Sequence, residues 1–127
     1  MKLKTAPAAI LLLVVAGDHL NLYLREHYNS IPKVGDLFLL TVIAAIVFAI
    51  LVLIRPSALV LAAAAGFAAS VLLAYMLTLY LPHGLFLFKE PKISYSGAIS
   101  ILAELGVFVL LAPAAIRALR AHRAKLL

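Results

Sequence analysis

The 127-residue chain contains no cysteine and no tryptophan, and only 13% of its residues are charged. Without cysteine it has no disulfides, thiolate metal sites or iron–sulfur clusters. Without tryptophan, tyrosine must supply any aromatic belt at a membrane–water interface. Soluble domains carry roughly 25% charged residues, and disordered chains are poor in hydrophobic residues, whereas this chain is 66% hydrophobic. The composition therefore predicts an integral membrane protein.

Common catalytic motifs are also missing from the sequence. It contains no G-x-S-x-G, no Walker A motif, no G-x-G-x-x-G and no H-E-x-x-H. A bis-histidine haem would need two facing intramembrane histidines, and only His19 qualifies. These absences favour a protein without enzymatic activity, and the sequence specifies no cofactor.

Four stretches are long and apolar enough to cross a bilayer. A crossing helix needs about 20 mostly apolar residues, whereas barrel strands would alternate over about 10 residues. The expected spans are residues 6–24, 36–54, 57–81 and 97–116, followed by a basic tail at 117–127. The sequence therefore predicts an all-α fold, a four-helix transmembrane bundle that forms one domain.

The distribution of lysine and arginine predicts the orientation of this bundle. Four spans place the termini and the Arg55 turn on one side, which carries Lys2, Lys4, Arg55, Arg117, Arg120, Arg123 and Lys125. The other side carries Arg25, Lys33, Lys89 and Lys92. The positive-inside rule then places both termini in the cytoplasm, in a multi-pass protein of the plasma (inner) membrane of a bacterium.

Two features of the chain ends bear on this topology. Residues 1–16 resemble a signal peptide that ends in Val14-Val15-Ala16. Leucines continue the helical pattern through Leu24, so we favour an uncleaved span. The tail at 117–127 is basic with interleaved leucines, a pattern that indicates contact with anionic lipid and no binding of nucleic acid.

The third span carries small residues at every fourth position, which allow close packing of helices in lipid. They are Ala58, Ala62, Gly66, Ser70, Ala74 and Thr78. This stripe predicts a tight helix–helix contact, made either inside the protomer or between protomers of a homo-oligomer. We favour the contact inside the protomer.

Polar residues from all four spans are expected at one depth. His19 lies about 8 Å and Glu104 about 10 Å below the outer surface, at 1.5 Å per residue. The layer also includes Asp18, Thr41, Tyr75, Thr78 and Ser100. Ionisable groups at membrane depth are costly and often functional, so we predict a small polar cavity that opens towards the outside.

Two other interpretations of the same layer remain open. A buried His19–Glu104 pair could fix helix register without any chemistry, with Asp18 and Asn21 reaching to the interface. A metal ion could be held by His19 and Glu104, together with Asp18 and His83. No H-x-x-x-H or E-x-x-H pair supports the metal interpretation.

Short motifs across most of the chain resemble small uncharacterised four-span membrane proteins of actinobacterial type. The resemblance is carried by His19–Tyr23 (HLNLY), Ile31–Leu40 (IPKVGDLFLL), Gly84–Glu90 (GLFLFKE) and Ala103-Glu104. It implies that His19, Tyr23, Pro32, Gly35 and Glu104 belong to a recurring pattern. It implies no established activity.

Three functions fit these observations. The first is binding of a small polar ligand, a cation or a proton at the His19/Glu104 layer, which would also suit transport. The second is an accessory subunit of a larger membrane complex, such as a respiratory or transport complex. The third is an enzyme that handles a lipid or quinone with His19 as acid–base.

Overall fold

The computed structural model describes residues 2–86 and 88–126, and it consists of four long helices. They are α1 (Lys2–Arg25), α2 (Val34–Ile54), α3 (Ala58–Tyr80) and α4 (Tyr95–Leu126), with a short 3-10 helix, η1 (Tyr28–Ser30), between α1 and α2. All four helices are long and apolar enough to span a membrane. The predicted all-α, four-helix architecture of a multi-pass membrane protein is therefore confirmed. Met1, Leu87 and Leu127 lie outside the described residues; they belong to the N-terminus before the first predicted span, the segment between the third and fourth spans, and the predicted tail at 117–127.

Serine side chains and a proline set several of the helix boundaries. Ser57 accepts a hydrogen bond from the backbone N–H of Val60 at 3.2 Å and caps α3. The Ser94 hydroxyl does the same for α4 by accepting from the N–H of Gly97 at 2.9 Å. Pro56 follows the end of α2, where it cannot continue the helical hydrogen bonding.

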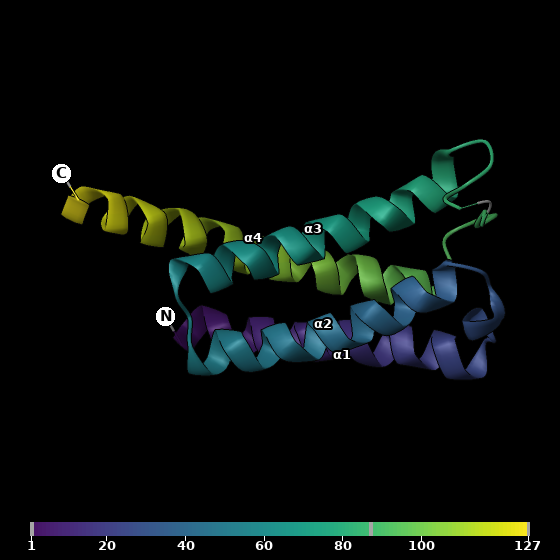
Figure 1. The fold of residues 1–127 in the computed structure, drawn as a ribbon, viewed down its shortest axis with the longest axis horizontal. Coiled ribbons are helices and arrows are strands. Elements are labelled where there is room, and N and C mark those ends of the chain that lie inside the picture. Colours follow the sequence, from purple (N-terminus) through teal and green to yellow (C-terminus); the bar gives the residue numbers. More distant parts are fainter. Residues whose placement is uncertain (1, 87, 127) are drawn as a thin grey trace.

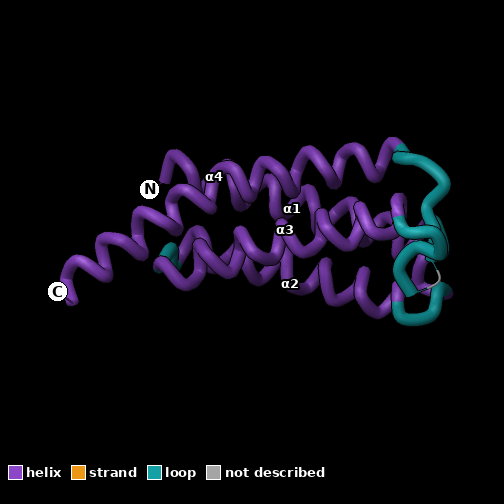
Figure 2. Tube along the Cα trace, turned by 90° about the horizontal axis from the view of Figure 1, so that it is seen from above, coloured by secondary structure: helices purple, strands orange, loops and turns teal. Residues whose placement is uncertain are grey.

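The helices pack as an incomplete ring in the order α2–α1–α4–α3. Contacts are extensive between α1 and α2, between α3 and α4, and between α1 and α4, and they are sparse between α2 and α3. Both termini lie at one end, and the long loop after α3 lies at the other (Figures 1 and 2). The bundle is therefore closed along three sides and weakly closed along the fourth.

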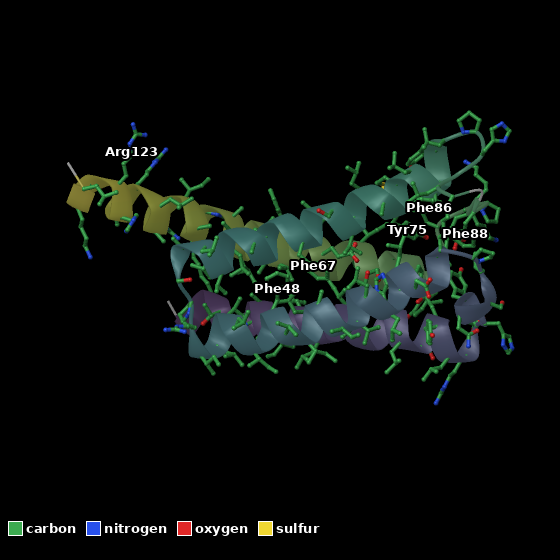
Figure 3. The ribbon with its side chains drawn as sticks, viewed as in Figure 1. Phe48, Phe67, Tyr75, Phe86, Phe88 and Arg123 are labelled. Atoms are coloured by element: carbon green, nitrogen blue, oxygen red, sulfur yellow. The ribbon has the colours of Figure 1, made fainter. Side chains whose placement is uncertain are left out.

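Helix α4 is longer than a bilayer crossing requires. Its 32 residues span about 48 Å at 1.5 Å per residue, against about 30 Å of hydrocarbon. Its last turns extend beyond the other helices (Figure 1), and the side chain of Arg123 is exposed there (Figure 3). The basic tail is thus a helical extension of α4 at the end that holds both termini.

The half of the bundle near the termini is tightly packed around small side chains. Its core consists largely of alanine with a few larger residues, such as Leu12, Leu61 and Leu111, which are fully buried. Alanine lets helix backbones approach closely, which is the main source of helix association in lipid. Large apolar side chains such as Leu59 and Leu102 are exposed on the outer surface, as expected for contact with lipid.

The predicted small-residue stripe of α3 does not form one packing face inside the protomer. Gly66 and Ser70 are exposed and Ala62 and Ala74 are half-buried, and a Cβ atom built on Gly66 would meet nothing within 4 Å. Positions four apart advance by about 40° around a helix of 3.6 residues per turn, so a long stripe spirals away from any one neighbour. The internal contact is made instead by the adjacent face, which consists of Leu61, Ala64, Ala65 and Ala68.

Candidate functional site

A cavity of about 410 Å³ lies in the half of the bundle opposite the termini. Its walls come from all four helices and from the loop after α3. The seven residues that the sequence assigns to the polar layer all line it: Asp18, His19, Thr41, Tyr75, Thr78, Ser100 and Glu104. The structure therefore brings these side chains to one cavity, and whether they bind a ligand there stays a prediction.

Asp18 is held by serine hydroxyls from α4. One carboxylate oxygen accepts a hydrogen bond from Ser100 at 2.6 Å and the other accepts from Ser96. The half-buried Asp18 thus joins α1 to α4 and does not simply reach to the interface. Both oxygens of Asp18 already accept hydrogen bonds, so Asp18 has less need of a ligand as a partner than an unpaired carboxylate would have.

Glu104 is different, because its side chain is buried and has no partner. Only 1% of the residue is exposed, and neither carboxyl oxygen has a hydrogen-bond partner among residues 2–86 and 88–126. The predicted pairing of Glu104 with His19 is therefore not made by a hydrogen bond. A buried polar group without a partner is costly, so this carboxyl is the least satisfied group in the site.

His19 is oriented by its own helix. Its Nδ1 lies 2.9 Å from the backbone oxygen of Val15, and since a carbonyl only accepts, Nδ1 is the donor in this contact. Its ring also packs on Phe38 of α2, with ring centroids 4.9 Å apart. The bond to Val15 leaves Nε2 as the remaining polar atom of the ring.

Most hydroxyl groups around the cavity are satisfied within their own helices. Thr41 donates to the oxygen of Leu37 at 2.8 Å, and Thr78 donates to the oxygen of Tyr75 at 2.6 Å. The hydroxyl of Tyr75 is the exception, because it is buried and has no hydrogen-bond partner in the described part of the chain. Tyr75 and Glu104 therefore provide the open hydrogen-bonding groups of the cavity.

The outer end of the cavity is covered by the loop after α3. The Tyr28 hydroxyl donates to Glu90 at 2.6 Å, and the N–H of Glu90 donates to the oxygen of Thr78 at 3.0 Å. The ring of Tyr28 packs between Phe88 and Phe38, at centroid distances of 5.4 and 5.0 Å. Figure 3 shows Phe86 and Phe88 at this end of the bundle.

This cover corrects the expected opening of the cavity towards the outside. The loop folds over the bundle, because Phe88 packs on Tyr28 and Glu90 accepts the hydrogen bond of the Tyr28 hydroxyl. Burial and the neighbouring Glu90 carboxylate raise the pKa of Tyr28, so its phenol keeps its proton and continues to donate at neutral pH.

The cavity reaches the surface of the bundle between α2 and α3. Three of its lining residues are themselves exposed there: Leu37 (40%), Leu40 (60%) and Ser70. Towards the termini the gap is closed by Phe48 of α2 and Phe67 of α3, whose rings lie 5.4 Å apart and face each other in Figure 3. The opening therefore faces the lipid that surrounds the bundle.

Apart from His19, the ionisable groups of the cavity wall are carboxyl groups and two phenols. The carboxyl groups are those of Asp18, Glu90 and Glu104, and the lining residues in the described ranges include no lysine or arginine. Among these residues no group of three or more His, Cys, Asp or Glu side chains could hold a metal ion. The predicted metal interpretation thus gains no support, and His83 is an exposed loop residue.

Sequence reasoning missed several residues that shape the site. Ser96 binds Asp18, and Tyr28 and Glu90 form the cover. Glu90 is the only acidic residue between α3 and α4, which is a signal for a specific partner. Its tyrosine partner lies 62 positions away, and no local pattern could have identified it.

The residues of the sequence resemblance fall into separate structural roles. A Cβ atom on Gly35 would lie 2.9 Å from the carbonyl oxygens of Tyr28 and Asn29, so this position requires glycine. Tyr23 is half-buried and Pro32 is exposed, and neither lines the cavity.

No protein-family model, curated protein or solved structure matches the chain.

Proposed function

We propose that this small multi-pass membrane protein binds a small ligand in the cavity between its helices, with Glu104 as the main polar contact. The observation that carries the proposal is the buried Glu104 carboxyl, which lines the cavity without any hydrogen-bond partner. Carboxyl groups at membrane depth are rare unless they are paired or functional. A ligand with a hydrogen-bond donor or a positive charge would supply the missing partner.

The other groups of the site support this proposal. The unpartnered hydroxyl of Tyr75 and the Nε2 atom of His19 provide further contacts for a polar group. The remaining walls are mostly apolar, as in most small-molecule sites. A cation or proton bound at Glu104 would also be the first step of transport across the membrane.

We propose that both termini face the cytoplasm of a bacterial cell and that the protein resides in the plasma membrane. The helical extension of α4 carries Arg117, Arg120, Arg123 and Lys125 beyond the membrane-spanning part. Basic residues next to a membrane are attracted by about 1 kcal/mol each to anionic lipid. This extension would then hold the end of α4 at the inner surface.

Native mass spectrometry tests the binding proposal. The protein would be purified in mild detergent as the wild type, as Glu104→Gln and as Glu26→Gln, in which the substituted residue is exposed and does not line the cavity. We expect a retained small molecule in the wild type and in Glu26→Gln, and its loss in Glu104→Gln. Equal retention in all three proteins, or retention in none, would refute the proposal.

A further inference from the structure

The walls of the cavity carry an imidazole and two carboxyl groups on the helices α1 and α4 and most of their apolar side chains on α2 and α3. Helices α1 and α4 contribute Asp18, His19, Ser100 and Glu104, and these side chains are buried or half-buried. Helices α2 and α3 contribute mainly apolar residues, such as Phe38, Leu40 and Val71. Four hydroxyl side chains lie among them, those of Thr41, Ser70, Tyr75 and Thr78. A molecule that fits both sides must itself have a polar end and an apolar body.

The acidic residues around the cavity indicate which polar group a ligand should carry. The carboxyl groups of the cavity belong to Asp18, Glu90 and Glu104, and no lysine or arginine among the described lining residues offsets them. Asp18 and Glu90 have hydroxyl donors, so Glu104 is the acidic group that lacks one. A positively charged nitrogen with N–H groups would match both the charge and the missing donors.

The position of the opening indicates the route by which a ligand enters the cavity. The cover formed by Tyr28, Phe88 and Glu90 lies between the cavity and the aqueous end of the bundle. Three of the four exposed lining residues, Leu37, Leu40 and Ser70, belong to α2 and α3, and the fourth, Ser94, directly precedes α4. A molecule dissolved in the bilayer meets this opening directly.

We infer that the cavity takes up an amphiphilic amine from the surrounding bilayer, with its ammonium group at Glu104 and its apolar chain between α2 and α3. This inference rests on the proposed function and specifies its ligand class. An inorganic cation would leave the apolar walls unused, and a neutral amphiphile would leave the acidic wall without a counter-charge. The volume of about 410 Å³ holds roughly 14 groups of the size of a water molecule, which is enough for a ten-carbon chain and its head.

Three probes that share one chain length test the charge requirement. They are decylamine, 1-decanol and decanoate, each added to the protein in nanodiscs of zwitterionic lipid and corrected for partition into empty nanodiscs. We expect wild type to bind decylamine at least tenfold more tightly than decanol, because a charge-assisted hydrogen bond contributes at this level. Decanoate is expected to bind most weakly. Equal or tighter binding of decanol or decanoate would overturn the inferred class.

Glu104→Gln is the matched variant, because it keeps the shape of the side chain and removes the charge. We expect it to weaken decylamine binding at least tenfold and to change decanol binding less than threefold. Glu26→Gln should leave both unchanged. Unaltered binding of decylamine to Glu104→Gln would overturn the inference even if wild type binds it tightly.

A tryptophan at the opening tests the route. Ser70→Trp places a large side chain where the cavity meets the lipid, and Leu73→Trp places the same side chain at an exposed position of α3 outside the cavity lining. We expect Ser70→Trp to slow the association of decylamine at least tenfold, with Leu73→Trp close to wild type. Equal rates in the two variants would refute access between α2 and α3.

The outcomes separate this inference from the proposed function. If native mass spectrometry shows a molecule that depends on Glu104 but decanol competes as well as decylamine, the ligand class is wrong and the binding function stands. If no molecule is retained and none of the three probes binds, the proposed function fails and the inference fails with it.

Discussion

Gly97 lines the cavity and leaves room there for the side chain of Tyr75. Gly97 lies in the first turn of α4 and is buried. A Cβ atom at this position would lie 2.6 Å from Cζ and 2.9 Å from Cε2 of Tyr75, and it would overlap the hydroxyl oxygen. The contact is with a rigid aromatic ring, so Gly97→Ala must displace Tyr75 or separate α3 from α4.

The magnitude follows from two opposing effects. Overpacking of this kind costs about 1–3 kcal/mol, whereas replacing a helical glycine by alanine gains up to about 1 kcal/mol. We therefore expect Gly97→Ala to lower the free energy of unfolding by roughly 1–2 kcal/mol. Gly66→Ala is the matched control, because a Cβ atom there meets nothing within 4 Å, and it should be neutral or stabilising.

Reversible unfolding in bicelles with increasing dodecyl sulfate measures these differences. The double variant Gly97→Ala/Tyr75→Leu should recover part of the loss, because the smaller side chain removes the overlap. If Gly97→Ala proves as stable as Gly66→Ala, or if Tyr75→Leu gives no rescue, the packing of Tyr75 against α4 is not as described.

Three further predictions concern the contacts around the cavity. Tyr28→Phe and Glu90→Gln should each lower the unfolding free energy by about 1 kcal/mol, and a double-mutant cycle should show coupling; additive effects would mean that their hydrogen bond does not stabilise the cover. Ser100→Ala should cost about 1–3 kcal/mol, because Asp18 loses one of its hydroxyl donors, and an unchanged unfolding curve would contradict this. Lys89 donates to the backbone oxygens of Leu79 and Leu81 at the end of α3. Lys89→Met should therefore speed amide hydrogen exchange in the last turn of α3 and leave exchange at the start of α3 unchanged.

The number of the helices and most of their bounds could be predicted from the apolar runs of the sequence. A bilayer crossing requires such runs, and they define α1 to α3 and the start of α4 within a few residues, whereas α4 continues ten residues past the predicted span at 97–116. The depth of each polar residue also follows from the helical rise. Depth was enough to place His19, Tyr75, Ser100 and Glu104 around one cavity.

The rotation of each helix could not be predicted in the same way. The stripe through Gly66 and Ser70 suggested one packing face, but burial on α3 depends on which neighbours surround it. His19 and Glu104 lie at similar depth, yet the imidazole binds the oxygen of Val15 in its own helix. Local sequence patterns predict the depth of a residue in the membrane and the periodicity of its helix. Which side chains pair across the bundle depends on contacts between segments that are distant in the sequence.

The cover over the cavity was also outside the reach of local patterns. The apolar run at 85–88 in the loop after α3 favours burial, but it does not identify the surface against which the loop is buried. Its attachment depends on Tyr28, Phe38 and Phe88, which come from three separate segments and pack in one row. This attachment moves the opening of the cavity from the aqueous end to the side that faces lipid.

The bond between Asp18 and Ser100 has a consequence for biosynthesis. The two residues lie 82 positions apart, so at about 5–20 residues per second Ser100 is synthesised roughly 4–16 s after Asp18. During this interval α1 must stay in the membrane or the insertion machinery with its carboxylate unmatched by the serines of α4. The hydrogen bonds of Asp18 in α1, the first helix to be synthesised, therefore form only when α4, the last helix, is present. A chain that stops before α4 leaves the Asp18 carboxylate without these donors, which membrane quality control could recognise.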